Sequence, residues 1–250
     1  MDHAHKEKPY LTIVVPAYQE EQRIASGLSS IFAYLKRQSY SFEVLVVDDG
    51  SSDGTIGVLR AFQQQEPTLR IVQHERNRGK GAAVRTGMRA AQSHFALIAD
   101  ADGSTPITEI QKLFSALQHG NDIAIGSRYL PGSVLLRKQP FTRRMMGRAG
   151  NLLFRIIFGL RYSDTRCGFK LFSEIARAKI FQLQRLERWG FDTEILVIAK
   201  QLGLTVAEVP VQWHDHSTFS NVRPIRDSLR SFKELYDIWR HLRAGHYPRH

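Results

Sequence analysis

The chain has 250 residues, 42% of them hydrophobic, which is ordinary for a globular protein and enough for a sizeable core. Its formal net charge of +11 predicts a polyanionic partner: nucleic acid, an anionic membrane surface or phosphate-bearing substrates. The single cysteine, Cys167, excludes an intrachain disulfide and fits a reducing compartment. No apolar run approaches the about 20 residues that a membrane span needs, so a protein acting on membranes would lie on their surface.

The first half of the chain alternates apolar, β-branched segments with helical ones. The expected strands are Leu11–Val15, Val44–Val47, Phe95–Ala99 and Ile123–Ile125, and the expected helices are Glu21–Arg37, Thr55–Gln64 and Gly81–Ala91. Strands that are continuously apolar are buried on both faces, as in a parallel sheet covered by helices. The sequence therefore predicts a doubly wound, mostly parallel α/β sheet that binds its ligand at the carboxyl ends of its strands.

The pattern changes after Tyr129. A loop with Pro131 and Gly132 leads to a basic helix, and the elements expected after it are a strand at Gly168–Phe172, a helix near Phe191–Leu202, a strand at Val206–Trp213 and an amphipathic helix from about Arg226 to Leu242. Because no internal repeat or long linker separates the two patterns, we expect one domain over residues 10–243, with tails at residues 1–9 and 244–250.

Acidic and aromatic residues follow the first two expected strands. After the first come Pro16, Ala17, Tyr18 and Glu20, where the ring suits stacking on a base and Glu20 suits a hydrogen bond from a base or ribose. The alternative is an ordinary strand end before an acidic helix start. After the second comes the segment 48–55, whose carboxylates suit ribose hydroxyls, the alternative being a helix-capping turn without a ligand.

Two carboxylates one residue apart, Asp100 and Asp102, follow the strand at Phe95–Ala99. Residues i and i+2 of an extended segment point the same way, so both can face one cation. Mg²⁺ typically uses one or two carboxylates plus substrate phosphates, and it would neutralise a departing diphosphate. A lone D-x-D motif is more often a pair of acidic loop residues without a ligand. Acidic residues at the ends of three successive strands favour a ligand-binding site.

The segment Asn77–Ala83 opens a helix with small residues and two cations. Free amides at a helix start attract phosphate, and Lys80 adds a point charge. The alternative is a glycine-rich turn with exposed basic side chains. The segment strengthens the prediction made from the three acidic strand ends.

Basic residues concentrate between Asp122 and Asp164, where eight lysines and arginines occur and no acid. Arg144, Arg148 and Arg155 share one helix face beside an apolar surface. Such a helix can lie in a membrane interface, and we expect it to dock on anionic lipid and guide a lipid phosphate to the metal. The alternative is a surface helix packed on the protein's own core.

These segments, in this order and with Gly126-Ser127-Arg128, resemble the family-2 inverting glycosyltransferases. Asp164–Lys170 and Arg188–Glu194 look most like the dolichyl-phosphate β-glucosyltransferase branch of the dolichyl- and polyprenyl-phosphate sugar synthases. The resemblance covers roughly Thr12 to Trp239 and implies a GT-A fold with a D-x-D metal site. It also implies that residues 10–128 form the nucleotide-sugar-binding half and residues 129–243 the acceptor- and membrane-facing half.

The motifs and the resemblance together predict the site residues. The expected contacts to the nucleotide-sugar donor are Pro16, Ala17, Tyr18, Glu20, Val47, Asp49, Lys80, Asp100, Ala101, Asp102 and Arg128. Asp100 and Asp102 would hold Mg²⁺ or Mn²⁺, and Asp102, Asp192 and Arg128 are the expected catalytic residues. The expected acceptor-phosphate and membrane contacts are Arg144, Arg148, Arg155, Arg223 and Arg226. The last two would replace a lysine of the family's acceptor loop that Phe219–Asn221 lacks.

The resemblance implies transfer of a hexose, glucose from UDP-glucose, to dolichyl or polyprenyl phosphate with inversion. A phosphate acceptor is already anionic near neutral pH, so cations that hold both substrates matter more than a base. The alternatives are a GDP-mannose-dependent lipid-phosphate mannosyltransferase and a family-2 transferase acting on a saccharide hydroxyl, which would need Asp192 or Glu194 as base. A non-catalytic nucleotide-sugar binder is also open.

Nucleic acid is not expected as a partner, because the acids concentrate where its backbone would be repelled. We expect a cytoplasmic protein, peripheral on the cytoplasmic face of the membrane. A separate anchor subunit and a homo-oligomer are both left open by the sequence.

Overall fold

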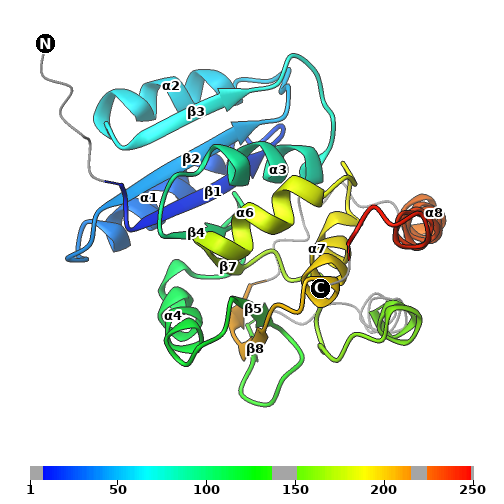
Figure 1. Ribbon diagram of the computed structural model, residues 1–250. Coiled ribbons are helices and arrows are strands. Elements are labelled where there is room, and N and C mark those ends of the chain that lie inside the picture. Colours follow the sequence, from blue (N-terminus) through cyan, green and yellow to red (C-terminus); the bar gives the residue numbers. More distant parts are fainter. Residues whose placement is uncertain (1–7, 137–150, 215–223, 249–250) are drawn as a thin grey trace, which may run out of the picture.

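The computed structural model of the chain describes residues 8–136, 151–214 and 224–248, with only the backbone described for residues 224–232. A seven-stranded sheet forms the centre of this described part (Figure 1). Its strands, in spatial order, are β3 (Leu69–Gln73), β2 (Phe42–Asp48), β1 (Leu11–Ala17), β4 (Phe95–Ile98), β7 (Lys170–Ser173), β5 (Ile123–Ser127) and β8 (Val206–Pro210). All neighbours pair in parallel except β7, which is antiparallel to β4 and β5.

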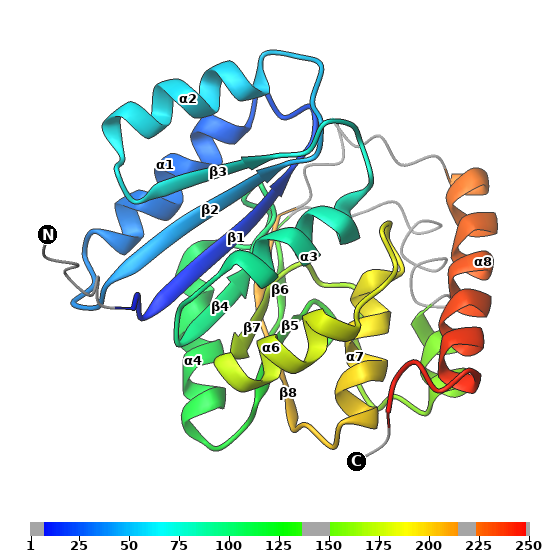
Figure 2. The same cartoon turned by 45° about the horizontal axis from the view of Figure 1, so that its top comes forward.

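Helices cover both faces of the sheet. They are α1 (Ile24–Leu35), α2 (Thr55–Gln65), α3 (Lys80–Ala90), α4 (Ile110–Gln118) after the short 3₁₀ helix η1 (Ile107–Glu109), α6 (Glu174–Leu183), α7 (Phe191–Gln201) and α8 (Pro224–Arg243). Residues 151–158 are also helical. Figure 2 shows α3 and α6 in front of the sheet, α1 and α2 behind it, and α8 standing beyond α7.

Alternate residues of one strand enter two separate cores. Leu11 and Ile13 of β1 belong to a cluster with α1 and α4, whereas Val14 belongs to a cluster with α3, α6 and α7. All three side chains are fully buried. A strand with helices on both faces needs apolar side chains at every position, which is why β1 is continuously apolar in sequence. The predicted α/β class with a mostly parallel sheet is confirmed.

Three features differ from the expectations. β3, α4 and α6 were not expected, because their apolar residues are interspersed with polar ones. The single strand expected at Val206–Trp213 is divided into β8 and the short β9 (Gln212–Trp213), which pairs with β6 (Val134–Leu135) in a second sheet. β7 runs against its neighbours, because the chain enters this strand from the edge at which β4 and β5 end.

One residue of the segment expected as a C-terminal tail, Tyr247, is buried. Tyr247 is 2% exposed, and its hydroxyl donates a hydrogen bond to Glu194 Oε1 at 2.6 Å. Through Tyr247, the segment expected as a tail contacts α7 at Glu194. A buried aromatic ring with one polar atom needs such a partner, and Glu194 supplies it.

Candidate active site

The functional side chains meet at one edge of the sheet. β1, β2, β4 and β5 all end there, so the segments that follow them lie side by side, as Ala17 opposite Asp48 illustrates. The antiparallel β7 begins at this same edge, and its first residue, Lys170, stands opposite Ile98 and Ile125. The fold thus adds the segment before β7 to the four strand ends that the sequence predicted.

Glu20, Asp100 and Asp102 form an acidic group at this edge. Burial raises the pKa of Glu20; Arg23 opposes that effect, and repulsion from Asp102 and Asp100 adds to it. Glu20 Oε1 accepts from Arg23 Nη2 at 2.7 Å, while Glu20 Oε2 is buried and has no hydrogen-bond partner in the described part of the chain. A buried carboxylate oxygen without a hydrogen-bond partner, beside two further acids, suits binding of a cation or of a hydrogen-bond donor.

Lys80 neutralises the charge of Asp100, the first aspartate of the D-x-D pair. Its Nζ lies 2.5 Å from Asp100 Oδ1 and 5.4 Å from the ring centre of Trp189. Burial lowers the pKa of Lys80, but the carboxylates of Asp100 and Asp192 outweigh burial and raise it above its ordinary value. A Cβ at Gly168 would collide with the carboxylate of Asp100, so the segment before β7 packs directly on this aspartate.

The chemistry of these acids fits a divalent ion only together with a substrate. In the residues that the structure describes, no group of three or more His, Cys, Asp or Glu side chains could hold a metal. Asp100 and Asp102 supply two carboxylates, and Mg²⁺ or Mn²⁺ would take its remaining oxygens from a diphosphate and water. Such an ion must compete with Lys80 for Asp100. The metal assignment stays a prediction.

Asp49, predicted to contact the donor, holds a loop. Its carboxylate accepts hydrogen bonds from His74 Nδ1 at 2.7 Å, Asn77 Nδ2 at 3.0 Å and the amide of Gly79 at 2.6 Å. These bonds shape the turn that starts α3 at Lys80. In the neighbouring Asp48, which opens the same acidic segment but was not among the expected donor contacts, Oδ1 is buried without a partner in the described residues.

The other residues predicted to contact the nucleotide-sugar donor differ in their exposure to solvent. Tyr18 is 40% exposed, as a ring that stacks on a base must be. Pro16 and Ala17 are buried at the end of β1, and Ala101 is 5% exposed. Val47 is fully buried in the core, so only its main chain could reach a ligand. Whether these residues contact the donor stays a prediction.

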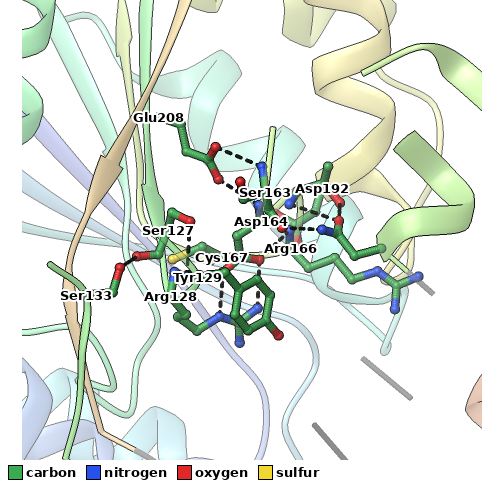
Figure 3. Close-up of polar contacts among 12 residues, drawn as sticks. Ser127, Arg128, Tyr129, Ser133, Ser163, Asp164, Arg166, Cys167, Asp192 and Glu208 are labelled. Atoms are coloured by element: carbon green, nitrogen blue, oxygen red, sulfur yellow. Dashed lines mark hydrogen bonds and ion pairs between the residues drawn. The ribbon is translucent and has the colours of Figure 1, made fainter. Parts of the chain in front are cut away.

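Arg128 lies in a fixed ion pair (Figure 3). Its Nε and Nη2 donate to the two oxygens of Asp164 at 2.7 and 2.9 Å, and its guanidinium lies 5.4 Å from the ring centre of Trp213. Asp164 is 1% exposed, and its backbone amide donates to Glu208 Oε1 at 2.7 Å. A bidentate pair of this kind holds β5 to the segment before β7. The catalytic role predicted for Arg128 is not tested by this contact.

Asp192, at the start of α7, is paired with a buried lysine. Lys170 Nζ lies 2.5 Å from Asp192 Oδ1, and Lys170 is completely buried. Burial raises the pKa of Asp192, while Lys170 and then Lys80 oppose the rise. Glu194 is also fully buried, and its carboxylate accepts from Tyr247 and from the amides of Arg185 and Leu186. Glu194 therefore has a structural role, and it is not placed to act as a base.

The acceptor side is only partly described. Arg144, Arg148 and Arg223 lie outside the described residues, and the side chain of Arg226 in α8 does too. Arg155 lies within helix 151–158, and its Nε is buried without a partner in the described residues. In this helix Phe154 is 2% exposed, whereas Ile156 is 71% exposed. Apolar side chains thus face both the core and the surface, and the predicted lipid contact stays a prediction.

Comparisons with known proteins agree with this geometry. Residues 12–178 match the family described as Glycosyl transferase family 2. The chain is 36% identical over 242 residues to the dolichyl-phosphate beta-glucosyltransferase of Drosophila melanogaster, an alignment that covers 92% of this chain and 74% of the relative. It is 39% identical over 243 residues to the Mus musculus protein of the same name, covering 91% of this chain and 74% of the relative.

Solved structures with the same fold include two sugar-phosphoglycerate synthases. The glucosyl-3-phosphoglycerate synthase of Mycobacterium tuberculosis in complex with phosphoglyceric acid aligns with a TM-score of 0.68 and 21% identity over 92% of this chain and 80% of that chain. The mannosyl-3-phosphoglycerate synthase of Rubrobacter xylanophilus aligns with a TM-score of 0.67 and 18% identity over 95% of this chain and 76% of that chain. At these identities the likeness shows the fold, which is of the GT-A type, as predicted.

Proposed function

On the premise that this chain belongs to glycosyl transferase family 2 and is a glycosyltransferase, we propose that it transfers glucose from UDP-glucose to dolichyl or another polyprenyl phosphate. The observation that carries the proposal is the group of Glu20, Asp100 and Asp102 at the carboxyl edge of the sheet, with Lys80 paired to Asp100. The relatives from Drosophila melanogaster, Saccharomyces cerevisiae and Mus musculus, which are 33–39% identical to this chain over the aligned residues, carry the name dolichyl-phosphate beta-glucosyltransferase, which supports the sugar and the acceptor.

The proposed reaction is a single displacement at the anomeric carbon. An oxygen of the acceptor phosphate forms a bond to that carbon as the bond to the diphosphate breaks, so the configuration inverts. The acceptor oxygen is already anionic near neutral pH and needs no base. A metal ion held by Asp100 and Asp102 would supply charge neutralisation for the leaving diphosphate. Lys80, which already lies at Asp100, adds a cation on the same side.

The alternative acceptors and donors have less support. A saccharide hydroxyl would need a carboxylate base, but Glu194 is committed to Tyr247 and two backbone amides, and Asp192 is paired with Lys170. A GDP-mannose-dependent reaction is not favoured by the names of the relatives. The proposal therefore keeps UDP-glucose as donor and a lipid phosphate as acceptor.

A transfer assay tests the proposal directly. Purified protein is given UDP-glucose, UDP-galactose or GDP-mannose with Mg²⁺ or Mn²⁺ and dolichyl phosphate in detergent, and the lipid product is extracted. We expect glucosyl lipid from UDP-glucose, lost on chelation and reduced about 100-fold or more by Asp102→Asn. Glu66→Gln, which neutralises an acid just before β3, at the opposite edge of the sheet, should leave the rate unchanged. Transfer from GDP-mannose and from no other donor, or a lack of transfer from all three donors, would refute the proposal.

We also propose that the protein works peripherally on the cytoplasmic face of a membrane. Within the described residues, no helix has the length and apolar character to cross a bilayer. Helix 151–158 nevertheless exposes Leu152 by 52% and Ile156 by 71%, in a segment of the chain rich in arginine. Exposed apolar side chains beside cations suit the interface of an anionic leaflet.

Flotation with anionic liposomes tests the membrane proposal. Ile156→Asp should reduce the bound fraction, because it places a charge where the side chain would enter the lipid. Ile175→Asp is the matched control, since Ile175 is 63% exposed on α6, outside this helix. Equal binding of both variants and the unchanged protein would show that helix 151–158 is not the docking element.

A further inference from the structure

One arginine in the segment before β7 has donors without hydrogen-bond acceptors. The backbone amide of Arg166 donates to Asp164 Oδ1 at 3.2 Å, which fixes its main chain beside the Arg128 pair. Its guanidinium makes no hydrogen bond in the part of the chain that the structure describes, and it lies 4.8 Å from the ring centre of Phe154. Figure 3 shows this guanidinium pointing away from Arg128 and Asp164. Within the described residues, the five N–H donors of this guanidinium are thus without an acceptor.

The carboxylates nearest to Arg166 are already engaged. Burial lowers the pKa of Arg166, and attraction to Glu234 and Asp192 only partly opposes that effect. Glu234 accepts hydrogen bonds from the backbone amides of Gly190 and Trp189, and Asp192 is paired with Lys170. A partly buried guanidinium that these acids do not bind is destabilised by its surroundings, and an anion that enters would relieve this.

Arg166 belongs to the same edge of the sheet as the D-x-D acids. Gly168, two residues further on, packs against the carboxylate of Asp100. Asp192 interacts electrostatically both with Arg166 and with Lys80, which binds Asp100. An anion on Arg166 would therefore lie near the position at which the donor diphosphate meets its cation.

Exposed apolar side chains lie on the helix that contacts this guanidinium. Phe154, under Arg166, belongs to helix 151–158, which exposes Leu153 by 36% and Ile157 by 43% on its surface. α8, which carries Glu234, exposes Tyr236 and Trp239 on its opposite face, since these lie two and five residues beyond Glu234. A cation beside one exposed apolar helix face matches a molecule with an anionic group and a hydrocarbon chain.

We propose that Arg166 binds the phosphate of the lipid acceptor, with the hydrocarbon lying along helix 151–158. This inference rests on the proposed function and adds to it a residue that selects the acceptor. The planar guanidinium offers two parallel N–H donors to two phosphate oxygens, and its Phe154 contact holds the plane in place. Arg166 would thereby orient the attacking oxygen without donating or accepting a proton.

The test separates acceptor binding from donor binding. Initial rates are measured for Arg166→Gln with dolichyl phosphate and UDP-glucose varied in turn. Loss of a charge-assisted pair should raise KM for dolichyl phosphate about 10- to 100-fold, with KM for UDP-glucose unchanged. Arg166→Lys should recover only part of the loss, because an ammonium cannot bind two oxygens in one plane. Arg161→Gln, at an exposed arginine five residues earlier, is the control.

Each result has a definite meaning. Unchanged kinetics of Arg166→Gln, or an increase confined to KM for UDP-glucose, would overturn the assignment while leaving the proposed function intact. If the unchanged protein glucosylates glycerol phosphate and not dolichyl phosphate, the lipid part of both proposals fails. Circular dichroism melting should give the same Tm for Arg166→Gln and Arg161→Gln. A lower Tm for Arg166→Gln alone, with KM unchanged, would assign Arg166 a structural role instead.

Discussion

Two cation–aspartate pairs stand at the same edge of the sheet, and they differ in how firmly they are held. Lys80 and Asp100 share one contact of 2.5 Å, with side chains 19% and 31% exposed. Arg128 and Asp164 share two contacts of 2.7 and 2.9 Å, and Asp164 also accepts from the amide of Arg128 at 3.1 Å. The side chain of Asp164 is 1% exposed. The two cations are equally exposed, at 19%, so the pairs differ at the aspartate: Asp100 is accessible to water and Asp164 is not.

This difference distinguishes an ion pair whose partners can be replaced by a ligand from an ion pair that stabilises the fold. An ion pair with one bond and access to solvent is a contact that a metal ion or a diphosphate can replace. A buried bidentate pair adds little net stability to the fold, but removal of one partner leaves the other as an uncompensated buried charge. The donor side of the site is therefore built to exchange partners, and the Arg128 pair is built to hold β5 and the segment before β7 together.

The largest expected effect comes from breaking the fixed pair. Asp164→Asn leaves Arg128 without its buried partner and should destabilise the fold by about 3–5 kcal/mol. Thermal melting should show a fall in Tm of roughly 10 °C. Glu66→Gln is the control, since it removes the partner of Lys36, whose side chain is 58% exposed, and should cost at most about 1 kcal/mol. Equal losses in the two variants would mean that the Arg128 pair is no firmer than a surface pair.

A smaller effect should follow from opening the exchangeable pair. Lys80→Met removes the cation that competes for Asp100, so Mn²⁺ titration without nucleotide should show about tenfold tighter binding. Glucose transfer should fall, because the same cation is lost at the diphosphate. Lys80→Arg keeps the charge and should keep the weaker affinity. Mn²⁺ affinity that is unchanged or lower in Lys80→Met would show that Lys80 does not compete with the metal.

The smallest expected effect is a pH dependence that belongs to the fixed pair. Burial would raise the pKa of Asp164, but Arg128 outweighs burial and holds it below its ordinary value. The pair's stability is therefore fully present above the unfolded-state pKa, near 3.9, and declines as pH falls through the lower folded-state value. Melting from pH 7 to pH 3 should show a steeper acid decline in the unchanged protein than in Asp164→Asn. Parallel curves would contradict this assignment.

The donor half was largely predictable from sequence. Leu11–Val15 and Phe95–Ala99 were expected as strands, and the structure has β1 and β4 there. Residues that follow parallel strands must share one edge, so the meeting of Glu20 with Asp100 and Asp102 followed from strand order and polarity alone. What could not be foreseen is that Asp49 would be bound by the loop before α3, because that contact depends on the path of the loop.

The acceptor half was predicted less well. The expected strand at Gly168–Phe172 corresponds to β7, but its reversed direction was not expected, and this direction brings Lys170 to the active edge. The sequence analysis weighed Glu194 as a base, and the fold binds it to Tyr247 in a segment expected to be free. Arg166 gave no signal of its own, because its pattern resembles that of any exposed arginine in a basic chain.

The sequence by itself determined the class of the fold, the family and the edge of the sheet at which the acidic side chains gather, since these depend on local pattern: apolar runs, strand ends and the residues after them. Only the tertiary structure decided which charges are free to act. Lys80, Arg128, Lys170 and Arg166 are all cations near aspartates, and their different burial and partners separate the exchangeable from the fixed. Burial and partner choice depend on contacts between segments far apart in the chain, which no local pattern records.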